Sequence, residues 1–147
     1  MSLKRLIRII YLTLAVLLGT TGTSWGADYN KGMEAYQSDD FATALREWKP
    51  LAEFGLPNAQ FNLGWMYHKG QGVLQDYKTA VKWYTLAAEQ GDADAQFNLG
   101  LMYYYGQGVP QDYEIALKWY TLATETPGEG EVRTRDAIWP WRSATNA

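Results

Sequence analysis

Apolar residues recur at helical spacing through the middle of the chain. In one segment they fall at intervals of three and four residues, and the intervals return 36 positions later: Ala80, Trp83, Tyr84 and Ala87, then Ala116, Trp119, Tyr120 and Ala123. The segment before them carries another stripe, made of Ala59, Leu63, Met66 and Tyr67. Such spacing places apolar side chains along one face of an α-helix. The pattern therefore predicts alternating amphipathic helices.

These helices belong to a repeat. Residues 59–90 and 95–126 are identical at 23 of 32 positions. This period, with two helices per unit, is typical of helical solenoids, in which a unit buries its apolar face only against its neighbour. A weaker copy comes first, with Asp40, Trp48 and Gly55 standing 36 positions before Asp76, Tyr84 and Gly91. We expect an all-α superhelical solenoid of antiparallel helix pairs near residues 28–55, 56–91 and 92–126.

Residues at the expected helix ends fit this division. Pro57 suits a first helical position, where its missing N–H costs nothing, and the Asp92 carboxylate can accept from exposed amides. Glycines at the ends of the first helices can adopt a left-handed closing conformation, and aspartates can cap the second helices. The closing glycines are Gly70 and Gly106, and the capping aspartates are Asp76 and Asp112.

Two glycines interrupt the expected first helices. Gly64 and Gly100 stand inside the pattern, where glycine costs about 1 kcal/mol relative to alanine. We therefore predict that a neighbouring helix packs too close to these positions for a side chain.

The fixed positions of the unit resemble the Sel1-like repeat, a relative of the tetratricopeptide repeat. They are Ala59, Leu63, Gly64, Tyr67, Gly70, Gly72, Val73, Asp76, Ala80, Trp83 and Ala87, matched again from Ala95 to Ala123. The resemblance covers residues 28–126. It implies a right-handed superhelix and an adaptor or scaffold role in protein complexes. Some exported bacterial relatives are rich in cysteine and linked to β-lactam binding, whereas this chain has no cysteine.

A second apolar face on the first helices suggests a binding surface. Three of its positions change in size or charge between copies, from Trp65, His68 and Lys69 to Leu101, Tyr104 and Tyr105. We predict that Asn58, Trp65, His68, Lys69, Asp94, Leu101, Tyr104 and Tyr105 line a concave groove for an extended peptide or a partner helix. The expectation for Phe61 and Phe97 is packing between successive helix pairs. For Trp65, Tyr104 and Tyr105, packing within the array stays open as the alternative, since large aromatic side chains serve cores and interfaces alike.

The composition gives little support for chemistry. The chain has no cysteine and one histidine, His68, so neither a histidine-based triad nor a metal site rich in cysteine or histidine can be assembled. We expect a solvent-exposed His68 at a helix end, and no catalytic centre, metal or cofactor. We therefore predict a non-enzymatic protein-binding adaptor. The alternative, by analogy with the family, is a cell-wall or β-lactam-directed hydrolase.

Residues 1–26 have the three zones of a secretory signal. A basic start is followed by the apolar stretch 9–18, and Ser24 and Gly26 supply small residues before a cut at Ala27. An uncleaved anchor is the alternative, but a membrane span needs about 20 apolar residues. We expect a periplasmic or secreted protein that meets its protein or peptide partner in the cell envelope and touches the membrane only through the uncleaved leader.

Loss of this leader makes the protein more acidic. The net charge is −3 for the whole chain and becomes −6 for residues 27–147, because Lys4, Arg5 and Arg8 leave and no acidic residue does. Binding to nucleic acid requires clustered cations facing the phosphates. We therefore expect no nucleic-acid partner.

The repeat pattern fails after Ala123. Residues 127–147 form a polar linker and an aromatic tail containing Ile138, Trp139 and Trp141. The tail could fold back as a cap on the open end of the solenoid, or the end could bind a partner. A tail that docks only weakly is the expectation, because Pro140 disfavours a helix at Trp139. An altered end of a longer array is a further alternative.

Overall fold

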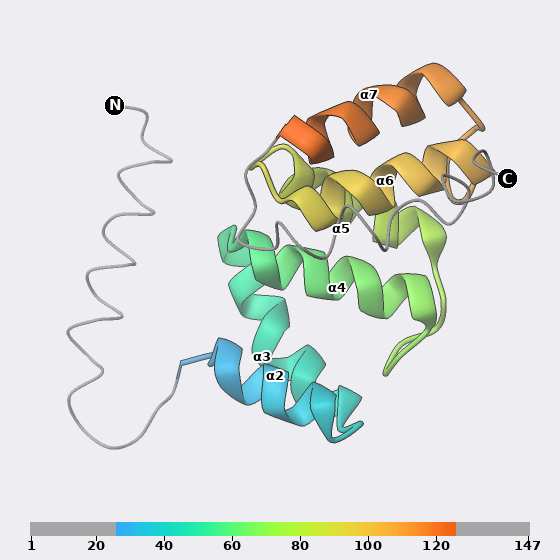
Figure 1. Cartoon of the computed structure of the whole chain (residues 1–147). Helices are drawn as coiled ribbons and strands as arrows, with labels where there is room; N and C mark the ends of the chain where they lie inside the picture. Colours follow the sequence, from blue (N-terminus) through green and yellow to red (C-terminus); the bar gives the residue numbers. More distant parts are fainter. Residues whose placement is uncertain (1–25, 126–147) are drawn as a thin grey trace, which may run out of the picture.

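The computed structural model describes residues 26–125, which form six α-helices and no strand. They are α2 (Tyr29–Gln37), α3 (Phe41–Phe54), α4 (Pro57–Lys69), α5 (Tyr77–Ala88), α6 (Ala93–Tyr105) and α7 (Tyr113–Glu125) (Figure 1). The predicted all-α solenoid is confirmed. The predicted leader, apart from Gly26, and the predicted tail lie outside the described residues.

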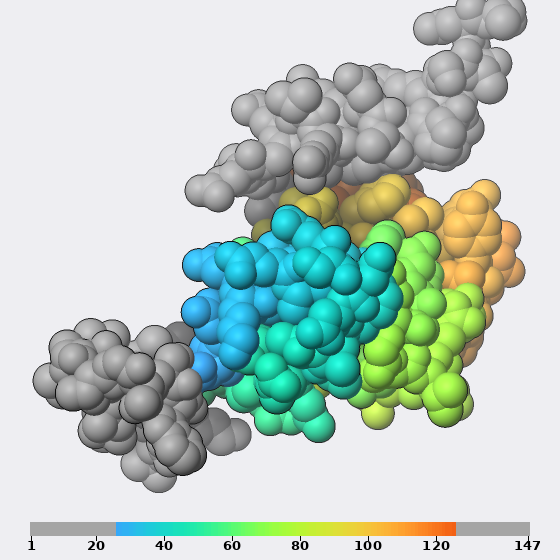
Figure 2. Space-filling view, turned by 90° about the horizontal axis from the view of Figure 1, so that it is seen from below, coloured from blue at the N-terminus to red at the C-terminus, as the bar shows by residue number. Residues whose placement is uncertain are grey.

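The helices stack in pairs in the order of the sequence. The chain runs out along α4 and back along α5, then out along α6 and back along α7 (Figure 1). Each helix packs mainly against the helices that precede and follow it in the sequence. Figure 2 shows the first pair, coloured blue to teal, lying beside the green residues of the second. None of the helices in residues 26–125 has the length and apolar character needed to cross a bilayer.

The helix ends follow from local side-chain chemistry. The Asp76 carboxylate accepts hydrogen bonds from the amides of Lys78 and Thr79 at 3.0 and 3.2 Å, and Asp92 accepts from the Ala95 amide at 2.8 Å. These bonds satisfy amides that have no partner within the helix. Pro57 opens α4 as predicted. The predicted left-handed closures are also present, with φ of 69° at Gly70 and 68° at Gly106.

Two buried apolar clusters join successive pairs. One buried cluster joins α3 to α4 and contains Trp48, Leu63 and Met66. A second joins α5 to α6 around Tyr84 and Leu99. In both clusters the second helix of one unit meets the first helix of the next. A single unit would therefore expose its apolar side chains to water, as expected for a solenoid.

A buried glutamine links each full unit to the one before it. The Gln60 side chain donates to the carbonyl of Ala52 at 3.1 Å, and Gln96 donates to the carbonyl of Ala88 at 3.0 Å. Both glutamines are only 4% exposed. The carbonyls lie in the last turns of α3 and α5, and each also accepts a backbone hydrogen bond, from Gly55 and Gly91 respectively, at 3.0 Å. The same bond, repeated after 36 residues, sets how the units stack.

Inside each pair the two helices approach at a glycine. A Cβ atom at Gly64 would lie 2.6 Å from Cδ1 of Tyr84, and one at Gly100 would lie 2.6 Å from Cε1 of Tyr120. The predicted close approach is therefore confirmed. The first pair has the same arrangement, because a Cβ atom at Gly32 would meet the indole ring of Trp48.

We predict that Gly64→Ala destabilises the fold. The added methyl group would clash with the ring of Tyr84, which is completely buried and has no room to move away. Overpacking of this kind costs about 1–3 kcal/mol. Thermal unfolding followed by circular dichroism should show a midpoint lowered by at least about 4 °C. The exposed Lys82→Ala serves as the control and should change stability by less than about 0.5 kcal/mol. An unchanged midpoint for Gly64→Ala would contradict the proposed close contact.

Candidate partner-binding surface

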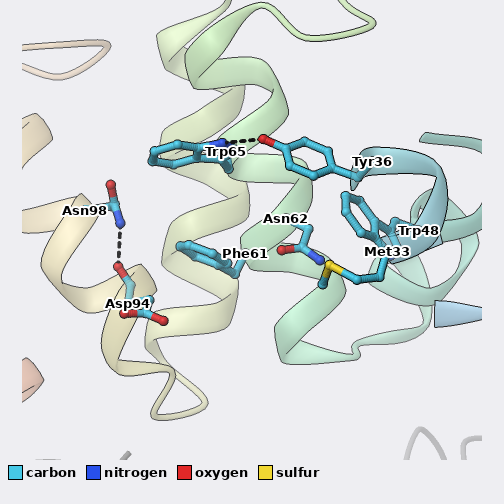
Figure 3. A pocket seen from close by; sticks show the side chains of 8 residues that line it. All are labelled: Met33, Tyr36, Trp48, Phe61, Asn62, Trp65, Asp94 and Asn98. Carbon is cyan, nitrogen blue, oxygen red and sulfur yellow. Dashed lines mark hydrogen bonds between the residues drawn. The ribbon is translucent and has the colours of Figure 1, made fainter. Parts of the chain in front are cut away.

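The first helices of the three pairs enclose a hollow on their shared side. Its volume is about 380 Å³, and it is lined by Met33 and Tyr36 from α2, Trp48 from α3, Phe61, Asn62 and Trp65 from α4, and Asp94 and Asn98 from α6. Figure 3 shows the rings of Phe61 and Trp65 one turn apart on α4, with α2 on one side and α6 on the other. All three units therefore contribute to one surface, which we call the inner hollow.

Trp65 is held in place by its neighbours. Its indole nitrogen donates to the Tyr36 hydroxyl at 2.8 Å (Figure 3), and that hydroxyl donates to the Gln71 side chain at 2.8 Å. The ammonium group of Lys69 lies 4.6 Å from the centre of the Trp65 ring, within reach of a cation–π attraction. These contacts connect α2, α4 and the loop after α4, so the half-buried ring has a fixed orientation.

Two asparagines add hydrogen-bonding groups to the inner hollow. The Asn62 amide donates to the Tyr29 hydroxyl at 3.2 Å, and the Asn98 amide donates to the carbonyl of Asp94 at 2.8 Å (Figure 3). They occupy the same position in successive units. The sequence analysis missed both, although Asn62 follows Asn58 by four residues and so lies on the same helix face.

Phe61 and Phe97 pack against the second helix of their own pair, whereas packing between successive pairs was predicted. Their ring centres lie 5.8 Å from Tyr84 and 5.5 Å from Tyr120, respectively. Phe61 also contacts the cluster that joins α5 to α6 and lines the inner hollow. Both phenylalanines are half-buried. One face of Phe61 therefore contributes to the core while another part remains open to the hollow.

His68 differs from the expectation of a solvent-exposed residue. It is half-buried, with its ring centre 5.5 Å from Tyr77 and 6.1 Å from Tyr84. Its Nδ1 lies 3.4 Å from the Tyr84 hydroxyl. Burial, followed by the nearby positive charge of Lys69, lowers the pKa of His68 below its ordinary value of 6.5. The prediction of a solvated side chain was wrong because α5 supplies two tyrosines that pack against the ring.

The remaining predicted positions lie away from the centre of the hollow. Tyr104 and Tyr105 are 44% and 63% exposed at the end of α6, and their ring centres lie 5.0 Å apart. Tyr104 also contacts Tyr113 of α7, with ring centres 5.2 Å apart. Leu101 is half-buried, and Asn58 is exposed at the start of α4. Of the eight predicted residues, the structure brings Trp65 and Asp94 together in the lining.

Acidic residues in the described part act mainly as structural groups. Glu47 is buried, and its carboxylate lies 3.0 Å from the Lys31 ammonium. It also accepts hydrogen bonds from the Asp28 amide at 3.1 Å and from the Arg46 side chain at 3.4 Å. These contacts hold the pKa of Glu47 below its usual value. Asp76 and Asp112 cap α5 and α7. Across residues 26–125, no three histidine, aspartate or glutamate side chains gather into a possible metal site.

Comparison with known proteins agrees with this architecture. The Sel1 repeat family matches residues 57–92 and 93–125. The chain contains two Sel1 repeats. The matched ranges contain α4 with α5 and α6 with α7. The family match therefore confirms the resemblance over residues 57–125. A search of curated proteins finds no match.

Solved structures of Sel1-repeat proteins have the same fold. The chain is 41% identical to c5321, a protective antigen of uropathogenic Escherichia coli strains, with a TM-score of 0.65 over 68% of this chain. It is 39% identical to a Sel1 repeat protein of Oxalobacter formigenes, with a TM-score of 0.62 over 67% of this chain. It spans only 22% and 40% of the lengths of these two proteins, respectively.

We predict that protonation of His68 destabilises the protein. A lowered pKa in the folded state means that the unfolded chain takes up the proton first, so the free energy of unfolding should fall as the pH drops below 6.5. The fall should cease below the folded-state pKa. Since the chain has one histidine, NMR can follow its ring signal without overlap from others, and the midpoint should lie below 6.5.

The control for this prediction is His68→Gln. Its free energy of unfolding should not show the loss below pH 6.5 that the native protein shows, because the variant lacks the titrating ring. Any remaining pH dependence comes from carboxylates such as Asp92, whose pKa burial raises above its ordinary value. A histidine midpoint at or above 6.5 in the native protein would contradict the burial of the ring.

Proposed function

We propose that this Sel1-repeat protein binds an extended peptide segment of a partner protein in the inner hollow. Members of the family generally act as scaffolds for protein interactions. The observation that carries the proposal is that aromatic rings and carboxamide groups from three successive units line one open surface. Peptide recognition generally combines pockets for apolar side chains with hydrogen bonds to the main chain.

Asn62 and Asn98 supply the groups needed to bind a peptide backbone. A carboxamide both donates and accepts hydrogen bonds, as a peptide bond does. Because both asparagines lie on one side of the array, one unit apart, an extended peptide could be held at two points along its length. Main-chain contacts of this kind bind many sequences, so specificity must come from neighbouring side chains.

Trp65 is the best candidate for an anchor. Tryptophan is enriched among the residues that carry most of the binding energy at interfaces. Its ring is already oriented by Tyr36 and Lys69, so little side-chain entropy is lost when a partner binds. The corresponding residue in the next unit is Leu101. The two units therefore present different side chains to a partner, which favours one peptide register over others.

The protein works in the cell envelope under this proposal. The basis is the signal-like pattern of residues 1–26, with small residues before Ala27. A non-enzymatic role fits the use of Asp76 and Asp112 as helix caps and the packing of His68 against tyrosines. The hydrolase suggested by family analogy has no comparable observation in its favour.

We predict that Trp65→Ala weakens peptide binding at least tenfold. Peptides are selected from a displayed library on immobilised protein of residues 27–147, and their dissociation constants are measured by fluorescence anisotropy. Loss of a central aromatic anchor commonly costs about 2 kcal/mol or more, which exceeds a tenfold change in affinity. The double variant Asn62→Ala, Asn98→Ala should weaken the same peptides through lost hydrogen bonds.

Leu86→Ala is the matched control for these variants. Leu86 is 44% exposed on α5, a second helix that does not line the inner hollow, so its removal should change affinity by less than about twofold. Circular dichroism establishes that each variant is folded. Peptides that bind the Trp65 and asparagine variants as tightly as the native protein would place the binding surface elsewhere.

We also predict that export removes residues 1–26. When the full chain is produced in a Gram-negative bacterium, the periplasmic fraction should contain a protein whose intact mass and N-terminal sequence begin at Ala27. Replacing Gly26 with a bulky residue should slow the cut, because the position before it requires a small side chain. An intact, membrane-bound chain would instead indicate an anchor.

A further inference from the structure

The last described helix leaves an apolar face open. Tyr113, Leu117, Tyr120 and Thr124 follow one another at intervals of four, three and four residues, so they share one face of α7. We call this the end face. Tyr113 is 59% exposed and Leu117 is 65% exposed. Exposed side chains of this size on neighbouring turns are unusual unless another segment covers them.

The equivalent face of α5 shows what such a surface normally contacts. Its residues are Tyr77, Val81, Tyr84 and Ala88, each 36 positions earlier. Tyr84 is completely buried and Ala88 is 2% exposed. Tyr77 and Val81 are half-buried against the cluster that includes Leu99 of α6. The following helix therefore covers this face in the middle of the array, whereas no described helix covers it on α7.

Residues 126–147 supply a segment long enough to reach the end face. Leu117 lies eight residues before the end of α7 at Glu125, or about 12 Å along the helix. The twelve residues between Glu125 and Ile138 can span up to about 40 Å. Ile138, Trp139 and Trp141 are the bulkiest apolar residues of this segment, and they come after a linker of sufficient length.

This segment lacks the sequence of another repeat helix. Ala95 and Gly100 are both buried in α6. The residues 36 positions after them are Glu131 and Asp136, which are charged. Ile138 and Trp139, in contrast, keep apolar side chains 36 positions after Met102 and Tyr103. The segment thus keeps apolar residues at the positions of Met102 and Tyr103. It has no small residues at the positions of Ala95 and Gly100, where close packing of helices requires them.

We propose that Ile138, Trp139 and Trp141 pack against Tyr113 and Leu117 and close the solenoid as a non-repeat cap. Pro140 disfavours a helical conformation at Trp139, so the cap lies across α7 as an extended segment. Covering the end face removes apolar surface from water and closes the last unit, as terminal caps do in solenoids. This inference concerns α7 and is independent of peptide binding in the inner hollow.

Engineered disulfides test the proposal directly, because the native chain contains no cysteine. The test pair is Leu117→Cys with Ile138→Cys in residues 27–147. The control pair is Lys118→Cys with Ile138→Cys, which has nearly the same tether length but places the thiol about 100° around the helix. If the cap is formed, the intramolecular disulfide should appear at least about ten times faster in the test pair.

Three results would overturn the proposal. Equal rates in the test and control pairs would mean that the tail does not dock on the end face. Faster covalent dimer formation by Leu117→Cys alone than by Lys118→Cys alone would assign the face to a second copy of the chain. If Leu117→Cys does not fold, the pair Tyr113→Cys with Ile138→Cys replaces it, with Glu114→Cys as the control, and equal rates there would also contradict the cap.

Discussion

The architecture depends on one contact, between a glycine in each first helix and an aromatic ring in the second. Gly32 meets Trp48, Gly64 meets Tyr84, and Gly100 meets Tyr120. The absence of a side chain lets the two helices approach closely, and the ring fills the space above the glycine. Trp48 and Tyr84 are buried almost completely, while Tyr120 is less buried because α7 is the last described helix. The same contact thus sets how closely the two helices of each pair approach.

This packing also determines where a partner can bind. The second helices cover one side of the first helices, and the buried glutamines hold each unit against the one before it. Between α2, α4 and α6 the inner hollow remains open, and its lining includes Trp65, Asn62 and Asn98. Positions shared by the repeats supply the scaffold, whereas positions that differ, such as Trp65 and Leu101, can distinguish one peptide from another.

Features governed by neighbouring residues were predictable from the sequence. Asp76 and Asp92 cap helices because their carboxylates reach amides two or three residues away. Gly70 closes α4 because its φ of 69° suits glycine. His68 was mispredicted because the tyrosines that bury it come from α5. The contribution of Met33 and Tyr36 was missed since the first unit has a different loop and lacks the strict period of the others.

The sequence by itself determined the helices, their ends, the 36-residue period and the glycines at which helices meet. These features rest on local hydrogen bonds and on the side of each helix that is apolar. Only the tertiary structure decided that Trp65 and Asp94 share a hollow with residues of α2, and that Tyr104 and Tyr105 lie outside its lining. Helical periodicity gives the direction of a side chain relative to the axis of the helix that carries it. Which residues of different helices become neighbours depends on how successive units stack.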